Sequence, residues 1–157
     1  MSPQPRSATD HGGRGRRAAM AAPGERFAQA LARQDAGALR AALAETVDFE
    51  ALTPGRHWQA ATGAEVAEQI ILGRWFGAGD HIVELCSVTT GQVADCAHVA
   101  YRVRVRRSGH DYLVEQQAYY RADGPHITWM RILCSGYQPV REDPVAAGGG
   151  GAPRRPA

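Results

Sequence analysis

The stretch that decides the fold is YRVRVRRSGHDYLVEQQAYYRADGPHITWMRIL, residues 101–133. Apolar and polar residues alternate along most of it, as they do in β-strands with one buried face. Two turn signals, Ser108-Gly109 and Asp123-Gly124, divide it into three strand-like runs. If each pair forms a two-residue hairpin turn, the stretch folds into three adjacent antiparallel strands.

This register predicts which side chains share a face of the sheet. Tyr101, Gln116 and Arg131 lie side by side, and their face must be buried because its other members are apolar or aromatic. Those members are Val99, Val103, Val105, Tyr112, Val114, Ala118, Tyr120, Ile127, Trp129 and Leu133. The opposite face collects His98, Arg102, Arg104, Glu115, Gln117, Tyr119, Met130 and Cys134. There Arg102 is expected opposite Glu115 as an ion pair. A slip of one residue would exchange the faces.

Upstream of this stretch the pattern changes to that of helices. Residues 24–35 and 36–46 carry apolar side chains at helical spacing, and residues 62–76 do so after a capping box. A strand is expected over residues 47–52, before a break at Pro54-Gly55. With one more strand-like run before the quoted stretch, residues 81–90, the pattern predicts an α+β fold whose helices cover one face of an antiparallel sheet.

The two ends of the chain differ in composition from the middle. Residues 1–23 and 141–157 are rich in Pro, Gly and Arg without hydrophobic periodicity, so we expect disordered tails around one domain, residues 24–140. The formal net charge of +2 is carried by these tails. An RGRR run at residues 14–17 could touch nucleic acid, but the absence of interleaved aromatic residues favours a solvated tail.

Several classes of protein are disfavoured by missing motifs. The sequence has no apolar stretch long enough to span a membrane and no apolar segment typical of a secretory signal, so we expect a cytoplasmic protein. Cys86, Cys96 and Cys134 fit neither a metal spacing nor a disulfide framework. Cys86 and Cys96 are symmetric about Gly91 and are expected to face each other on a hairpin as reduced thiols. No metal or phosphate motif occurs, which favours action without a metal or cofactor.

Three quoted stretches resemble a known superfamily. In order, RFAQALARQDAGALRAALAETVDF (26–49), TGAEVAEQIILGRWF (62–76) and RADGPHITWMR (121–131) look like nuclear transport factor 2-like proteins, which include ketosteroid-isomerase-like and SnoaL-like polyketide-cyclase-like members. The resemblance covers residues 24–138. It implies a cone-shaped, curled antiparallel sheet with three N-terminal helices packed on its concave face and a pocket inside. It also implies a homodimer through the outer sheet face, which carries Arg102, Glu115, Gln117 and Tyr119.

Three residues are candidates for catalysis. A guanidinium stays charged, so Arg131 on an apolar face is expected either to clamp a ligand carboxylate, phenolate or enolate or to pair with Asp48 or Glu50. The resemblance places Asp48 where isomerase-like members supply an acidic base, although it becomes a surface charge if Phe49 points inward. His57, in the loop after the Pro-Gly turn, could act as an acid or base near neutral pH or be solvated.

Other residues are candidates for ligand binding. Tyr101 and Gln116 could polarise a substrate carbonyl or could satisfy each other as buried polar groups. Trp58, Tyr120 and Trp129 are expected on the wall around a small apolar or aromatic molecule. These expectations indicate a small-molecule-binding protein that works without a cofactor, as an isomerase, cyclase or epoxide-hydrolase-type enzyme using proton transfer. The alternative is a non-catalytic ligand-binding or dimerisation module.

Overall fold

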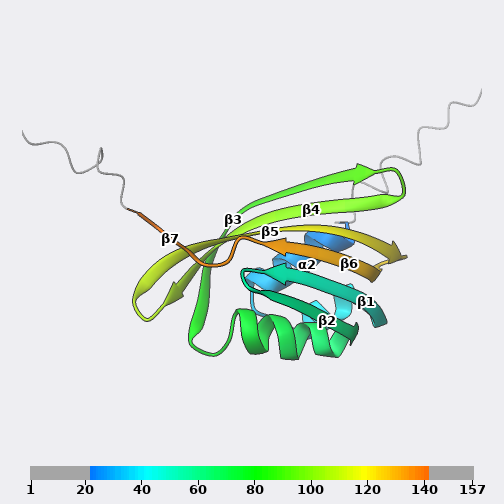
Figure 1. Ribbon diagram of the computed structural model, residues 1–157. Coiled ribbons are helices and arrows are strands. Elements are labelled where there is room, and N and C mark those ends of the chain that lie inside the picture. Colours follow the sequence, from blue (N-terminus) through cyan, green and yellow to red (C-terminus); the bar gives the residue numbers. More distant parts are fainter. Residues whose placement is uncertain (1–21, 142–157) are drawn as a thin grey trace, which may run out of the picture.

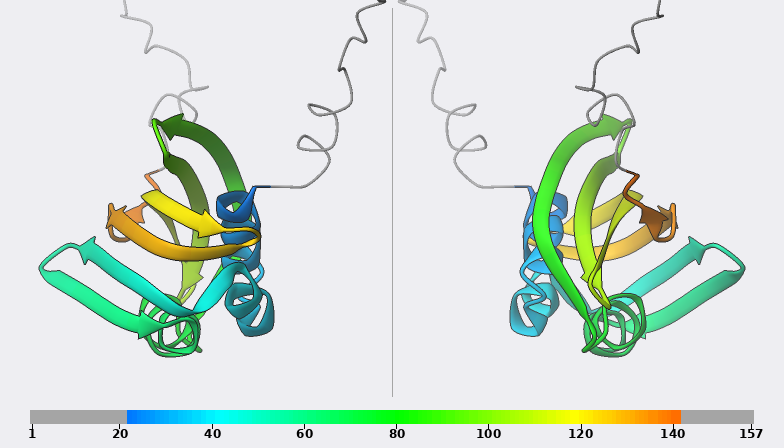
Figure 2. Two further views of the ribbon diagram at one scale, coloured as in Figure 1. Left: turned by 90° about the vertical axis from the view of Figure 1, so that its right-hand side faces the viewer. Right: turned by 90° about the vertical axis from the view of Figure 1, so that its left-hand side faces the viewer.

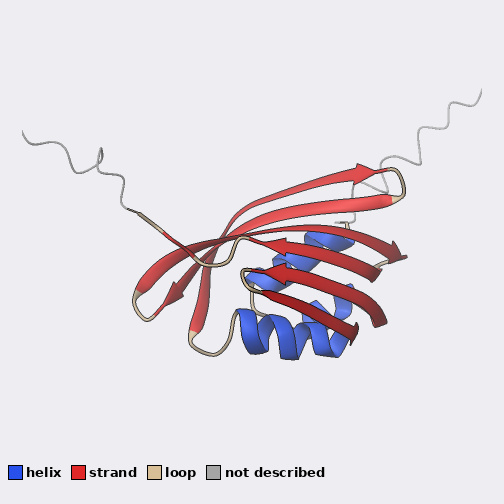
Figure 3. Cartoon of the chain, viewed as in Figure 1, coloured by secondary structure: helices blue, strands red, loops and turns tan. Residues whose placement is uncertain are grey.

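The computed structural model describes residues 22–141, and most of the two expected tails therefore lies outside the described part. No helix within this range is long and apolar enough to cross a membrane. The described residues form three helices and seven strands (Figures 1 and 3). In chain order they are α2 (Pro23–Ala32), α3 (Ala36–Ala42), β1 (Leu43–Thr53), β2 (Arg56–Thr62), η1 (Glu65–Trp75), β3 (Asp80–Val93), β4 (Cys96–Arg107), β5 (His110–Asp123), β6 (His126–Cys134) and β7 (Gln138–Pro139).

The strands form one curled sheet in the order β2-β1-β6-β5-β4-β3, with β7 also paired to β5. The sheet curls around α2, α3 and η1, so the predicted α+β cone is confirmed (Figure 2). The expectation of a wholly antiparallel sheet is wrong at one place, because β1 and β6 pair in parallel. A long connection of several elements separates these two strands, and such a connection permits either direction.

Helices α2 and α3 follow from local sequence signals. Helix α2 begins with Pro23, whose fixed φ suits the first turn, and it buries Phe27 and Leu31 against the sheet. Helix α3 begins after Asp35, whose carboxylate accepts a hydrogen bond from the backbone N–H of Ala38 at 3.0 Å. Packed on strands of the sheet, both helices lie on the concave side of the cone.

Helix η1 is wider than an α-helix. The backbone N–H of Phe76 donates to the carbonyl of Ile71 at 2.8 Å, a bond five residues back along the chain. The predicted capping box is present, since the hydroxyl of Thr62 accepts a bond from the backbone N–H of Glu65 at 3.2 Å. The buried residues recur in pairs at a spacing longer than 3.6 residues: Val66, Ala67, Ile70, Ile71, Trp75 and Phe76.

The central hairpin of β4 and β5 has the predicted register. Ser108 and Gly109 form its two-residue turn, both with positive φ. Tyr101 therefore lies opposite Gln116. On the other face the predicted ion pair of Arg102 and Glu115 is confirmed, with Nη2 and Oε2 2.7 Å apart.

The next hairpin turns one residue later than predicted. Asp123 pairs with His126, so Gly124 and Pro125 form the turn in place of Asp123-Gly124. Proline has no N–H to give to the ladder, which suits a turn position better than the first position of a strand. This correction shifts the pairing by two residues and leaves every side chain on its predicted face.

A β-bulge in β6 does exchange the faces. Ile127 pairs with Ala122 and Trp129 with Arg121, which leaves Thr128 as an extra residue between them. Beyond the bulge each residue therefore faces the side opposite to the prediction. Inside the cone are Met130, Ile132 and Cys134, and on the outer face are Trp129, Arg131 and Leu133.

The hairpin of β3 and β4 also departs from the prediction. Its turn is Ala94-Asp95 rather than Gly91, because Val93 pairs with Cys96. Cys86 is exposed at an irregularity in β3, so the prediction that it faces Cys96 is wrong. All three cysteines are free thiols.

Candidate functional site

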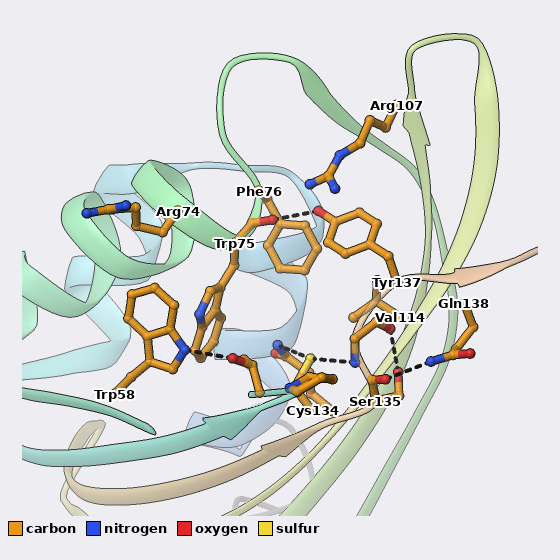
Figure 4. A pocket seen from close by; sticks show the side chains of 14 residues that line it. Trp58, Arg74, Trp75, Phe76, Arg107, Val114, Cys134, Ser135, Tyr137 and Gln138 are labelled. Atoms are coloured by element: carbon orange, nitrogen blue, oxygen red, sulfur yellow. Dashed lines mark hydrogen bonds between the residues drawn. The ribbon is translucent and has the colours of Figure 1, made fainter. Parts of the chain in front are cut away.

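A cavity of about 420 Å³ opens between the end of η1, the β1–β2 turn and the segment from β6 to β7 (Figure 4). Its volume falls in the range typical of small-molecule sites. Fourteen residues line it: Thr53, Pro54, Trp58, Arg74, Trp75, Phe76, Arg107, Val114, Gln116, Cys134, Ser135, Gly136, Tyr137 and Gln138.

Aromatic rings form much of the cavity wall. Trp58 comes from β2, which sequence analysis had expected to be a loop, and it meets Trp75 edge to face with ring centroids 6.1 Å apart. Phe76 and Tyr137 form a second pair, also with centroids 6.1 Å apart. Such walls favour flat apolar molecules, because aromatic rings stack or pack edge to face.

The innermost polar group on the wall is the amide of Gln116, which is 1% exposed. Its Oε1 accepts a hydrogen bond from the hydroxyl of Tyr101 at 2.6 Å, and its Nε2 donates to the sulfur of Cys134 at 3.3 Å. Burial raises the pKa of Tyr101 well above its usual value, so the phenol stays protonated and donates. Tyr101 and Gln116 thus hydrogen-bond to each other as buried polar groups, which was the alternative to their polarising a substrate carbonyl.

An ion pair closes one edge of the cavity. Arg107 at the end of β4 bonds the carboxylate of Asp80 through Nε at 2.5 Å and Nη2 at 2.9 Å. The hydrogen bond from Arg107 holds the pKa of Asp80 below its usual value. The same guanidinium lies 3.9 Å from the ring centroid of Tyr137, whose hydroxyl donates to the carbonyl of Trp75 at 2.5 Å. Burial raises the pKa of Tyr137, so this phenol also stays neutral.

Sequence reasoning missed Asp80, Arg107 and Tyr137 as site residues. Asp80 lies opposite Arg107 because the hairpin turns at Ala94-Asp95 and because β3 has two irregularities, and the expected turn at Gly91 predicted neither. Tyr137 follows the last long strand, where the positive φ of Gly136 turns the chain across the cavity. Within residues 22–141 no three His, Cys, Asp or Glu side chains are grouped to hold a metal ion.

The three predicted catalytic residues lie outside this cavity, on the outer sheet face. Arg131 was predicted to point into the cone, which is wrong because of the bulge; its Nη2 lies 3.0 Å from Asp48 and its Nε 3.4 Å from Glu50. Asp48 is exposed because Phe49 is the inward residue of β1. His57 of β2 lies 3.7 Å from Glu50. Arg131 therefore makes the ion pairs with Asp48 and Glu50 that were the alternative to its binding a ligand.

The predicted ligand-binding residues are divided between the two sides. Trp58 and Gln116 line the cavity, and Tyr101 lies directly behind Gln116. Trp129 is on the outer face rather than the inner one, with the guanidiniums of Arg121 and Arg131 each 4.6 Å from its ring centroid. Tyr120 does point inward, but it packs beside Gly24 of α2 and does not line the cavity.

A second depression, of about 460 Å³, lies on the outer face between β1, β2, β5 and β6. Its apolar members Leu52 and Leu133 are 51% and 62% exposed, and Tyr119 beside them is 45% exposed. Glu50, His57 and Arg131 border it. The outer face therefore combines exposed apolar side chains with charged groups.

Comparison with known proteins finds relatives by structure alone. No family model and no curated protein matches the sequence. An LEH-like epoxide hydrolase of M. tuberculosis has a TM-score of 0.56 at 17% identity, over 72% of this chain and 80% of that one. A Bacillus subtilis protein provisionally named an isomerase has a TM-score of 0.58 at 14% identity, over 69% and 81%. An NTF2-like protein of Burkholderia thailandensis has a TM-score of 0.53 at 15% identity, over 74% and 92%.

These similarities establish the architecture. The chain has the nuclear transport factor 2-like fold, as its resemblance to that superfamily predicted. At 17% identity or less these similarities show the fold alone, because one scaffold hosts many chemistries.

Proposed function

We propose that this protein binds a small apolar or aromatic molecule in the cavity beside η1. The observation that carries the proposal is an open space of about 420 Å³ walled by four aromatic side chains, Trp58, Trp75, Phe76 and Tyr137. A concave space of this size with a mostly aromatic wall and a few polar groups is typical of small-molecule sites.

Binding is favoured over acid–base chemistry by the placement of the titratable groups. Asp48 and His57, the expected proton carriers, lie on the outer face and cannot reach a molecule in the cavity. Asp80 is held by Arg107. A general base must come within hydrogen-bond reach of the proton that it removes.

Proton transfer on the bound molecule is the second candidate function, as an isomerase, cyclase or epoxide-hydrolase-type activity that needs no cofactor. It is favoured by the fold shared with an epoxide hydrolase and with the protein provisionally named an isomerase. Apart from two arginines, the titratable side chains on the cavity wall are Cys134 and Tyr137, so these two would carry the proton.

The test uses tryptophan fluorescence of the full chain carrying Trp129→Phe, which removes the one tryptophan outside the cavity. The probes are 2-naphthoate, 2-naphthylmethanol, 2-acetylnaphthalene and styrene oxide. We expect saturable quenching by at least the naphthalene compounds. Chromatography of the same mixtures for isomerised or hydrated product tests the second function.

A matched pair of variants locates the binding. Cys134→Phe places a ring in the cavity, whereas Leu133→Phe adds the same ring to the outer face one residue earlier. We expect Cys134→Phe to abolish the quenching and Leu133→Phe to preserve it, with both variants folded by circular dichroism. Equal binding by both variants, or no quenching by any probe, would contradict the proposal.

We also propose a homodimer through the outer sheet face, as the resemblance to the superfamily implied. Its support is the exposed apolar group of Leu52, Tyr119 and Leu133, bordered by charged residues. Apolar side chains surrounded by polar ones are typical of interaction surfaces.

A further inference from the structure

We infer that residues 136–140 form a strap at the mouth of the cavity, and that this strap is a gate with Gly136 as its hinge and Tyr137 as its latch. In what the gate admits, the inference rests on the proposed function, to which it adds the route by which a molecule enters and leaves. The movement of the strap itself does not depend on a ligand.

The strap touches both of the other parts of the cavity rim. Gly136 lies against the β1–β2 turn, so closely that a Cβ atom added to it would be 2.7 Å from Cγ of Pro54. Tyr137, the next residue, reaches the end of η1, where its hydroxyl donates to the carbonyl of Trp75 (Figure 4). The strap therefore completes the rim, and moving it aside widens the mouth.

Few backbone contacts hold the strap in place. Strand β7 consists of Gln138 and Pro139 alone, and proline has no N–H to give to the pairing with β5. Beyond this pairing, the backbone N–H of Val140 donates to the carbonyl of Asp111 at 3.1 Å, and the amide of Gln138 donates to the carbonyl of Ser135 at 2.8 Å. A segment held by so few bonds can open while the long strands stay paired.

Tyr137 makes the side-chain contacts that keep the strap closed. Its ring meets those of Phe76 and Tyr112, with centroids 6.1 and 5.7 Å away, and the guanidinium of Arg107 lies 3.9 Å from its centroid. Its hydroxyl bonds to the carbonyl of Trp75 at 2.5 Å. The last carbonyls of a helix lack partners within the helix, so water can replace the phenol there when the strap opens. The latch is therefore reversible at a low cost.

Gly136 is placed to act as the hinge. Its φ of +71° lies in the left-handed region, which glycine adopts without the steric cost of a side chain. The residue before it is still tied to β5, because the backbone N–H of Ser135 donates to the carbonyl of Glu115 at 2.9 Å and its hydroxyl accepts from the N–H of Glu115 at 2.9 Å. The chain is thus fixed up to Ser135 and can turn at the next residue.

The reaction of Cys134 with a thiol reagent measures how often the gate opens. This half-buried thiol lines the cavity beside the hinge. Cys96, which is also half-buried, lies at the far end of β4 from the cavity and serves as an internal reference. The full chain carrying Cys86→Ser is treated with N-ethylmaleimide, and peptide mass spectrometry follows the two remaining thiols separately.

Two variants loosen the strap. Tyr137→Phe keeps the ring and removes the hydroxyl, so we expect Cys134 to react about fivefold faster, as the loss of one hydrogen bond implies. Gly136→Ala cannot keep the closed position, because its φ is positive and its Cβ would collide with Pro54. We expect it to accelerate the reaction of Cys134 about tenfold or more. The rate at Cys96 should stay unchanged in both variants, and circular dichroism should show that both are folded.

Tyr112→Phe is the matched control, because its ring also meets Tyr137 while the bond to Trp75 belongs to Tyr137. It should leave the rate at Cys134 unchanged. An equal acceleration by this control would overturn the role of the latch. No acceleration at Cys134 in either strap variant would overturn the gate. So would an equal acceleration at Cys96, because the reactive state would then be general unfolding.

Ligand kinetics separate the gate from the proposed function. In the Trp129→Phe chain, stopped-flow fluorescence with 2-acetylnaphthalene should show association and dissociation both about fivefold faster after Tyr137→Phe, with the affinity changed less than about twofold, because the latch bond is present with and without ligand. Faster dissociation alone would make Tyr137 a binding residue and overturn the latch. If none of the naphthalene probes binds while Cys134 responds to the strap variants, the proposed function fails and the gate stands.

Discussion

Asp80 and Arg107 join the start of β3 to the end of β4, and they set the electrostatics at the edge of the cavity. Asp80 is 7% exposed, while the side chain of Arg107 is nearly half exposed. The carboxylate also accepts a hydrogen bond from the backbone N–H of Gly77 at 3.2 Å, at the end of the connection from η1. One carboxylate thus ties together three segments of the chain.

Asp80→Asn is expected to lower the free energy of unfolding by about 2 kcal/mol at pH 7, less than for a fully buried pair because Arg107 is partly solvated. The folded-state pKa of Asp80 lies below its usual value of 3.8, so its contribution is present above that value and is lost as the pH falls below it. Urea unfolding at pH 7 and at about pH 3 should therefore show a smaller difference from the unsubstituted chain in acid.

Asp111→Asn is the matched control, since Asp111 pairs with the exposed Arg106 on the surface. It should destabilise the fold less than Asp80→Asn does, because solvent screens a surface ion pair. Equal losses in the two variants, or a loss in Asp80→Asn that does not change with pH, would contradict the role given to Asp80.

Tyr101 and Gln116 could be predicted from the sequence, whereas Arg131 could not. The positions of Tyr101 and Gln116 depend on one turn, Ser108-Gly109, whose residues suit positive φ. The position of Arg131 depends on a bulge as well. Both candidate faces of β6 carry large apolar residues, so burial alone does not choose between them.

At the scale of the elements, the bulge at Thr128 decides which side chains of β6 reach the cavity. Upstream of it Ile127 is buried, and downstream the buried positions are Met130 and Ile132. The buried residues are thus three and then two positions apart, where a regular strand would space them by two throughout. The bulge can be inferred from this spacing only when the pairing with β5 is known. The position of the β5–β6 turn is indicated more directly, by Pro125, because proline has no N–H to donate to a neighbouring strand.

Deletion of Thr128 should be tolerated. It removes the unpaired residue and leaves Ile127 and Trp129 opposite their present partners, so every later side chain keeps its face. We expect a cooperative thermal transition by circular dichroism and a loss of at most about 2 kcal/mol.

Deletion of Gln117 provides the comparison, because Gln117 is exposed and lies in a regular part of β5, whereas Thr128 is the unpaired residue of the bulge. Its loss would turn the following residues to the wrong face, including Ala118 and Tyr120, and should abolish the transition. If the two deletions were equally harmful, the bulge would not be the feature that sets the register.

At the scale of the whole molecule, the two faces of the curled sheet differ in what covers them. The inner face is covered by helices and leaves the cavity at one end, while the outer face carries Leu52, Tyr119 and Leu133. The cone itself could be predicted from the order of its elements. The parallel pairing of β1 with β6 could not, because no local turn links these strands.

Leu133→Arg tests the proposed dimer. A charge in the middle of the apolar group should convert a dimer into a monomer, because an unpaired charge is costly at an interface. Size-exclusion chromatography with light scattering measures the mass directly. Val93→Arg is the control, since Val93 is 60% exposed at the tip of the β3–β4 hairpin and should leave the mass unchanged. A monomeric unsubstituted chain would rule out the dimer.

The pairing of β1 with β6 also has a consequence for the order in which the protein is made. Asp48 leaves the ribosome long before Trp129, its neighbour across the two strands. Until β6 is complete, the nascent β1–β2 hairpin has no sheet to join, and its apolar residues remain uncovered. The strands from β3 to β6 can pair locally as they emerge, so we expect the docking of β1, which closes a large loop, to be the slow, non-local event. We therefore expect the newly made chain to be most exposed to aggregation through the hairpin that was synthesised first.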